Sequence, residues 1–319
     1  MTTKALLCAA ALAAATLTQM PAAMALDQLK LAVGQRGNWD TAVSYLGEKA
    51  GIFKKHGLAL DITYTAGSGE TLQPVISNSV DIGIAIGTMG ALSAYGKGAP
   101  VRVIGAQATG AADYWYAKAG SGIDALKDTD GKTIAFSSRG SSTHSVVLAF
   151  INEFKLTAKP VATGSPPSTL TAVMTNQVDV GWAAPPFGLK EMDDGKITLI
   201  ARATDAKIVA GQTIRVIAVN AATLASKRDV LVRYMQAYKE TVDYMYASDQ
   251  ALKDYAELAK IDEKMARRVR DDFFPRSIIE PAPIKGLDTL LPEAVTLKFI
   301  DKELSKEQLA ELFQVPLQK

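Results

Sequence analysis

The positions of apolar residues predict strands that alternate with helices along most of the chain. Residues 29–33 alternate apolar and polar side chains as a half-buried strand does, and residues 58–64 predict a second strand. Between them, apolar residues at helical spacing over residues 41–50 predict a helix that ends at Gly51. Further strands are predicted at residues 80–86, 101–106, 132–136 and 214–219. This alternation is typical of α/β proteins whose sheets are mostly parallel and flanked by helices.

One helix–strand unit occurs twice in the chain. Thr71–Ala85 aligns without a gap on Thr169–Ala183, displaced by 98 positions, and 8 of the 15 pairs are identical. We therefore expect two similar α/β lobes with a ligand cleft between them. The expected division is lobe 1 (residues 26–112), lobe 2 (residues 113–219) and a helical C-terminal part (residues 220–319) that packs back on lobe 1. The chain then crosses between the lobes near residues 112–117 and 216–221, and these two crossings form a hinge.

The first 25 residues have the pattern of a cleavable secretion signal. Lys4 supplies a positive charge, residues 5–17 are apolar, and residues 23–25 (Ala-Met-Ala) match the small residues of a cleavage site. We expect cleavage after Ala25 and a mature protein in the periplasm. Cys8 is the one cysteine of the chain, so neither a disulfide nor a cysteine metal site is expected after cleavage.

Charge and composition limit the classes of function. The chain has 35 Lys and Arg against 33 Asp and Glu, so no basic field exists that would attract nucleic acid. The two histidines are far apart, no nucleophile motif is present, and no acidic cluster occurs in the expected cleft loops. We therefore expect no catalytic site, no metal site and no cofactor. Asp81 and Asp179 start equivalent strands of the repeat and are expected to be structural.

Ligands of open α/β sheets bind beyond the carboxyl ends of the strands. Four loops fall at such places, and the one at residues 137–143 offers five hydroxyls, the guanidinium of Arg139 and free amides at a helix start. Such a loop suits an anionic group, although a helix cap with surplus serines is the alternative interpretation. The tryptophans Trp39, Trp115 and Trp182 fall on these loops or at the hinge and suggest an apolar wall, with core packing favoured for Trp115. His144 is expected to bond hydroxyls or face solvent.

Several segments, residues 31–35, 50–58, 78–83 and 130–142, resemble those of a known family. The family comprises periplasmic substrate-binding proteins of ABC importers of the nitrate/sulfonate/taurine type, which includes binders of thiamine precursors. The resemblance implies a two-lobed, Venus-flytrap fold and a monomeric receptor that delivers its ligand to a permease in the inner membrane.

The resemblance also implies which residues contact the ligand. They are Gln35, Asn38, Trp39, Thr88, Met89, Ser138, Arg139, Ser141, Ser142, Trp182, Ala183 and Pro185. Where many relatives have an aromatic residue followed by Asp, this chain has Ala184, Pro185 and Pro186. The sequence thus predicts a non-enzymatic receptor for a small organic anion such as a sulfonate or carboxylate. The alternatives are a receptor for a neutral heteroaromatic such as a thiamine pyrimidine precursor, a signalling receptor, and an enzyme similar to fungal pyrimidine synthases, whose cysteine-rich motif is missing here.

Overall fold

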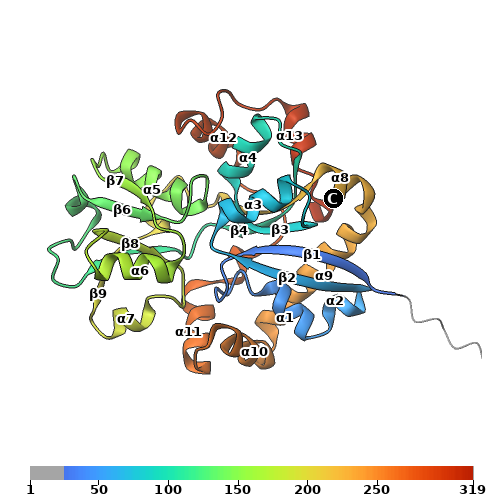
Figure 1. Ribbon diagram of the computed structural model, residues 1–319, viewed down its shortest axis with the longest axis horizontal. Coiled ribbons are helices and arrows are strands. Elements are labelled where there is room, and N and C mark those ends of the chain that lie inside the picture. The colour runs from blue at the N-terminus through green and yellow to red at the C-terminus, as the bar shows by residue number, and fades with distance from the viewer. Residues whose placement is uncertain (1–24, 319) are drawn as a thin grey trace, which may run out of the picture.

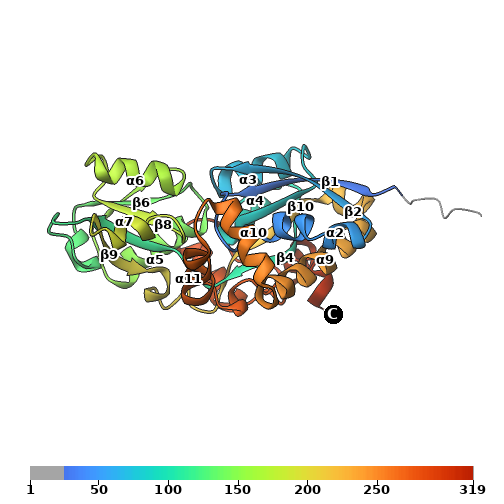
Figure 2. The same cartoon turned by 90° about the horizontal axis from the view of Figure 1, so that it is seen from below.

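The computed structural model describes residues 25–318, which form two lobes side by side along the long axis of the molecule (Figures 1 and 2). The expected signal segment lies, apart from its last residue, outside the described residues, and so does Cys8. The sheet of the first lobe contains, in spatial order, β2 (Leu58–Thr65), β1 (Asp27–Gly34), β3 (Ile82–Gly87), β10 (Thr213–Asn220) and β4 (Val101–Thr109). The sheet of the second lobe contains β7 (Lys159–Ala162), β6 (Thr133–Phe136), β8 (Val180–Ala183), β5 (Tyr114–Lys118) and β9 (Ile197–Arg202).

The two sheets follow the same plan. In the first, β10 pairs antiparallel with both β3 and β4, while β1 pairs parallel with β2 and β3. In the second, β5 pairs antiparallel with both β8 and β9, while β6 pairs parallel with β7 and β8. Each sheet is therefore mixed, with one strand that runs against its neighbours. In both lobes this is the strand that the chain forms directly after it has crossed from the other lobe.

Helices cover both sheets. Those of the first lobe are α1 (Val43–Lys49), α2 (Ile52–Lys55), α3 (Ser68–Ile76), α4 (Thr88–Gly96), α8 (Ala221–Ser226), α9 (Arg228–Ala247), α10 (Asp249–Ala259), α11 (Glu263–Phe273), α12 (Leu287–Thr296) and α13 (Lys306–Leu312). The second lobe has α5 (Ser142–Glu153), α6 (Pro166–Met174) and α7 (Leu189–Asp193). No helix within residues 25–318 has the length and apolar character needed to cross a bilayer.

The C-terminal part packs on the first lobe, as expected. Leu231, Tyr234 and Tyr238 lie on one face of α9 and are buried in the core of that lobe. Farther along, Phe313 forms a β-bridge with Val103 of β4. Ser305 caps α13 in a capping box, since its Oγ accepts from the Gln308 N–H at 3.2 Å.

The sequence repeat corresponds to α3–β3 in the first lobe and α6–β8 in the second. Its first residue makes the same contact in both copies, because Thr71 Oγ1 lies 2.7 Å from Thr65 Oγ1 and Thr169 Oγ1 lies 2.6 Å from Thr163 Oγ1. The two aspartates also correspond. Asp81 accepts a hydrogen bond from the Lys30 N–H of β1 at 2.9 Å, and Asp179 accepts one from the Thr133 N–H of β6 at 2.8 Å. Both carboxylates therefore tie two strands together, which is the structural role expected of them.

The chain crosses between the lobes twice. The first crossing runs from the end of β4 at Thr109 to the start of β5 at Tyr114, and the second from Arg202 to Thr213. Because β10 lies inside the first sheet, residues 213–219 join lobe 1 and not lobe 2, and the second crossing precedes the expected position at residues 216–221. The apolar run of β10 predicts a buried strand, but it fits the interior of either sheet equally well.

Candidate functional site

A small cavity lies between the lobes, beyond the carboxyl ends of β1 and β6, where the topology of α/β sheets places ligands. Its volume is about 20 Å³, which suffices for about one water molecule. Both lobes and the first crossing contribute to its wall, which consists of Gly34, Gln35, Asn38, Thr41, Gly67, Ser68, Ala85, Asp113, Ser137, Ser141, Ser142, Thr143, Trp182 and Arg215.

Next to the cavity, the two lobes touch through glycines and a serine. The Gly69 N–H at the start of α3 donates to Ser138 Oγ of the second lobe at 3.2 Å. At the start of α4, a Cβ added to Gly87 would lie 2.3 Å from the carbonyl oxygen of Gly140, and one added to Gly90 would lie 2.7 Å from it. These distances are shorter than any normal contact, so the observed approach of the lobes requires glycine at both positions.

A second set of contacts joins the lobes through α11. Arg268 of α11 forms an ion pair with Asp193 at the end of α7, at 2.7 Å. The guanidinium of Arg202, at the end of β9, lies 5.1 Å from the ring centroid of Phe273. Figure 2 shows α11 at the boundary between the lobes. The lobes are thus in contact at the cavity and along α11, and the structure is that of a closed cleft.

Serine and threonine hydroxyls form the second lobe's side of the cavity. Ser141 is the cap of α5, because its Oγ accepts from the His144 N–H at 3.1 Å, so the helix begins at Ser142. Thr143 Oγ1 lies 3.0 Å from both Ser137 Oγ and Ser141 Oγ. Ser142 and Thr143 therefore stand in the first turn of a 12-residue helix, where backbone N–H groups carry partial positive charge.

His144 belongs to the packing beside this loop. Its ring stacks on Phe136 with centroids 4.3 Å apart, and its Nδ1 accepts from the Gly140 N–H at 3.3 Å. Burial, and secondarily the charge of Arg139, lowers the pKa of His144 to about 4. The imidazole is therefore neutral at pH 7, and it is absent from the cavity wall.

Only one of the three tryptophans lines the cavity. Trp182 is 1% exposed, and its indole Nε1 has no hydrogen-bond partner in the protein. The other two are equally buried but partnered, since Trp39 Nε1 donates to Tyr246 OH at 3.1 Å and Trp115 Nε1 donates to the Ala135 carbonyl at 2.9 Å. Trp115 packs in the core as expected. Trp39 also packs inside its own lobe, between Tyr246 and Tyr255.

A buried charge cluster forms another part of the wall and was not anticipated from the sequence. Arg215 Nη2 lies 3.2 Å from Asp113 Oδ2 and 3.4 Å from Asp40 Oδ2, and all three side chains are at most 8% exposed. Asp113 Oδ1 and Arg215 Nε have no partner. The sequence predicts no acidic cluster in the cleft loops, and it does not predict that the single carboxylate of Asp113 lines the cavity. Both cavity residues could have been noticed, since each is the sole charge in an apolar stretch, residues 103–117 and 213–219.

Five of the expected contact residues line this cavity and the others lie elsewhere. Those at the wall are Gln35, Asn38, Ser141, Ser142 and Trp182. Thr88 instead donates to the Thr213 carbonyl at 2.6 Å, and Met89 packs in an apolar cluster of the first lobe. Ala183 lines a neighbouring cavity of about 220 Å³, which Phe187 and Ile261 also border, and Pro185 is buried in the loop after β8.

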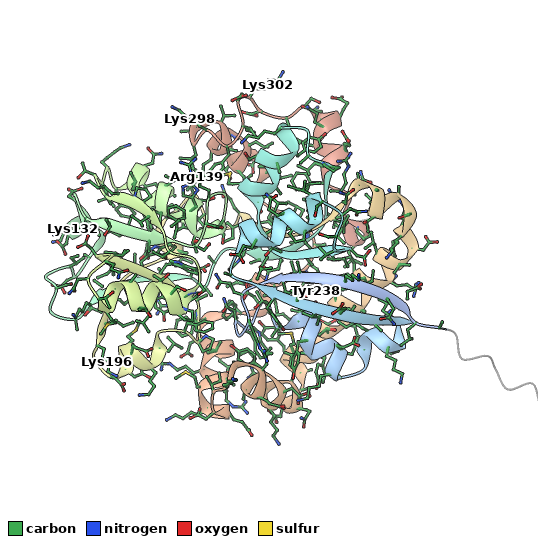
Figure 3. All side chains as sticks on the ribbon, in the orientation of Figure 1. Lys132, Arg139, Lys196, Tyr238, Lys298 and Lys302 are labelled. Carbon is green, nitrogen blue, oxygen red and sulfur yellow. The ribbon has the colours of Figure 1, made fainter. Side chains whose placement is uncertain are left out.

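Arg139 is exposed, and it is not part of the cavity wall. Figure 3 shows it at the surface, near the boundary between the lobes. The positive charge that faces the cavity is therefore that of Arg215. Among the described residues, no group of three or more His, Cys, Asp or Glu side chains is arranged to hold a metal ion.

The comparison with known protein families shows to which family the chain belongs. A family model described as "NMT1/THI5 like" matches residues 38–251, about two thirds of the chain. The chain belongs to this family. No curated protein sequence matches it at a significant level.

Solved structures with the same architecture include periplasmic binding proteins. The alkanesulfonate-binding protein SsuA of Xanthomonas axonopodis pv. citri, bound to MOPS, has a TM-score of 0.71 at 18% identity, with 85% of this chain and 91% of that chain covered. The periplasmic nitrate-binding protein NrtA of Synechocystis PCC 6803 has a TM-score of 0.72 at 11% identity, with coverages of 91% and 86%. A protein of Bordetella bronchiseptica RB50 has a TM-score of 0.72 at 19% identity, with coverages of 90% and 94%. These likenesses show that the chain has the two-lobed fold of the periplasmic binding proteins.

Proposed function

We propose that this protein is a solute-binding receptor of an ABC import system, which captures a small ligand between its lobes and delivers it to a permease. One observation carries the proposal. Five residues that line one cavity, from both lobes and the crossing, each carry a buried polar atom without a partner among residues 25–318: Gln35 Oε1, Asn38 Oδ1, Asp113 Oδ1, Trp182 Nε1 and Arg215 Nε. Buried polar groups are normally satisfied, so partnerless atoms that converge from two lobes indicate a ligand that supplies the missing bonds.

Two further findings support this function. The chain belongs to the NMT1/THI5-like family, and the structures that share its fold include an alkanesulfonate-binding protein and a nitrate-binding protein, which supports a binding function. The wall also offers hydrogen bonds and charge, but no nucleophile with an adjacent base, so binding without catalysis is the chemistry that suits it. We place the mature receptor in the periplasm as a monomer.

The ligand we favour is a small organic anion. Its acidic group would meet the hydroxyls of Ser141 and Ser142 and the first-turn N–H groups of α5, and Trp182 would contact its body. A specific observation favours a second candidate, a neutral heteroaromatic such as a pyrimidine. The free atoms include acceptors, Asn38 Oδ1 and Asp113 Oδ1, as well as donors, and a heteroaromatic ring can present both kinds of partner.

Binding requires the lobes to separate and close again. The cavity of about 20 Å³ has room for about one water molecule, so an organic ligand must enter while the cleft is open, and the side chains of the wall must rearrange around it as the lobes close. The two crossings, residues 110–113 and 203–212, are the segments about which the lobes can turn. A ligand that forms hydrogen bonds with both lobes binds the closed conformation more tightly than the open one, and it therefore shifts the equilibrium toward the closed conformation.

A thermal-shift screen tests this function. The mature protein is heated with sulfonates, carboxylates, nitrate and pyrimidines, each in excess. A ligand at 100 times its dissociation constant raises the free energy of unfolding by about 2.7 kcal/mol, so a clear increase of the melting temperature is expected for one class. Arg139→Ala is the matched control, because this side chain lies outside the cavity and the variant should show the same shift. A flat response across all classes would contradict the proposed function.

A further inference from the structure

Asp113 lines the cavity, and one of its carboxylate oxygens has no partner among residues 25–318. Its Oδ2 faces Arg215 Nη2 at 3.2 Å, whereas its Oδ1 is buried and makes no hydrogen bond. The residue is 1% exposed and is part of the cavity wall. Leaving a buried carboxylate oxygen without a donor is costly, so an occupant of the cavity that brings a donor to this point is favoured over one that does not.

The charges around the cavity favour the same occupant. Two buried carboxylates, Asp40 and Asp113, share the single guanidinium of Arg215, at 3.4 and 3.2 Å. Burial raises the pKa of Asp113, Arg215 lowers it, and the neighbouring Asp40 raises it, with a net increase. A ligand with a positive group or a proton donor beside Asp113 relieves this excess of acidic groups, whereas an anion without one adds to it.

The other free atoms of the wall are two neutral acceptors, Gln35 Oε1 and Asn38 Oδ1, and two donors. Trp182 Nε1 and Arg215 Nε both lack an acceptor, and the first turn of α5 adds further N–H groups. The cavity therefore combines three free acceptors, of which only that of Asp113 belongs to a carboxylate, with several donors. A complementary ligand has an acceptor or acidic group on one side and a hydrogen-bearing nitrogen on the other.

We propose that Asp113 determines specificity for ligands that carry a nitrogen with bound hydrogen, held at its free Oδ1. This inference rests on the proposed receptor function and narrows its ligand. Among small organic acids, the receptor selects zwitterions over analogues without the amine. Among heteroaromatics, it selects rings with an exocyclic amino group.

Matched pairs of ligands test this directly in the wild-type mature protein. Isothermal titration calorimetry compares aminoethanesulfonate with ethanesulfonate, aminopropanoate with propanoate, and aminopyrimidine with pyrimidine. A charge-assisted hydrogen bond corresponds to roughly 10- to 100-fold in affinity. In the ligand class that the receptor binds, the amino compound should therefore bind more tightly than its amine-free analogue by about this factor. Equal or tighter binding of the amine-free partner, or a best ligand without any N–H group, overturns the inference and leaves the receptor function standing. A protein that binds no small molecule overturns both.

Two variants distinguish a direct hydrogen bond between Asp113 and the ligand from a general effect of the buried negative charge. In Asp113→Asn the amide oxygen of the asparagine can still accept from Arg215, so the NH₂ group of the asparagine takes the place of Oδ1. The preference for the amino compound should then vanish or reverse. Asp40→Asn is the control, because Asp40 lies at a similar distance from Arg215 but outside the cavity wall. The ratio of the affinities for the amino and the amine-free compound should stay within about twofold of the wild-type ratio. Loss of the preference in both variants, or in neither, contradicts a direct contact with Asp113.

Discussion

At the scale of single residues, the free polar atoms of the cavity separate ligand-binding from structural roles. Trp115 and Trp182 lie opposite each other on neighbouring strands and are both fully buried. They differ in their indole N–H groups, because Trp115 donates to the Ala135 carbonyl and Trp182 donates to no protein atom. Two residues of the same type at adjacent positions therefore provide an internal comparison.

We predict that Trp115→Phe lowers the stability of the fold, whereas Trp182→Phe lowers the affinity for the ligand. Trp115→Phe leaves the Ala135 carbonyl without its donor and should lower the free energy of unfolding by about 1–3 kcal/mol, with ligand affinity unchanged. Trp182→Phe breaks no bond within the protein but removes a donor to the ligand, which should weaken binding by about 1 kcal/mol, or roughly fivefold. Chemical denaturation and calorimetry on both variants measure these quantities. Equal losses of affinity in the two variants would contradict the assignment of Trp182.

The sequence predicted some of the site residues and missed others for a physical reason. Asn38, Ser141 and Trp182 could be found because they lie close to strand ends, and strand ends meet at the cleft. Trp39 follows the same rule but points into its lobe, where Tyr246, 207 positions later in the chain, accepts its N–H. The direction of a loop side chain depends on such distant partners. The sequence pattern around a loop residue therefore does not predict whether its side chain points into the cleft or into the core.

At the scale of helices and strands, the start of α4 determines how closely the lobes approach. Gly87 has a φ of −60°, which an alanine adopts without strain, and the nearest atoms to an added methyl belong to Gly140 and Ser141 of the other lobe. An alanine therefore fits the first lobe and obstructs only closure. Gly96, at the other end of the same helix, offers a matched position where a Cβ would meet Ile300 at an ordinary 3.4 Å.

Gly87→Ala should fold normally but bind ligand poorly. Overpacking at such a contact costs about 1–3 kcal/mol, and here the cost falls on the closed state, so the dissociation constant should rise by roughly 5- to 100-fold. Gly96→Ala should bind as wild type does. Calorimetry with the ligand from the screen measures both affinities, and melting temperatures confirm that both variants are folded. Wild-type affinity in Gly87→Ala would show that ligand binding does not require this contact.

The repeat at residues 71–85 and 169–183 predicted the paired architecture more fully than single elements did. It located α3–β3 and α6–β8, and the equivalent threonine and aspartate contacts confirm the duplication. The position of β10 was not predictable in the same way. Strand pairing between residues more than 100 positions apart, such as Val216 with Ala106, is decided by the assembled sheet and not by the strand's own pattern.

At the scale of the whole molecule, the proposed function requires the two lobes to close on a ligand. The lobes are joined by only two crossings, about which they can turn as bodies. Opening of the cleft would break the contacts Gly69–Ser138 and Arg268–Asp193. The latter pair is largely exposed and contributes about 0–1 kcal/mol, so closure depends chiefly on what the cavity holds. Without ligand, open and closed forms should therefore coexist.

Small-angle X-ray scattering of the mature protein, with and without the ligand found in the screen, tests this central claim most directly. The radius of gyration should fall when the ligand reaches saturation in the wild type and in Gly96→Ala, and it should fall less in Gly87→Ala, whose lobes cannot reach the closed contact. An unchanged radius in the wild type, with a ligand that calorimetry shows to be bound, would contradict closure of the two lobes as the way this protein captures its ligand.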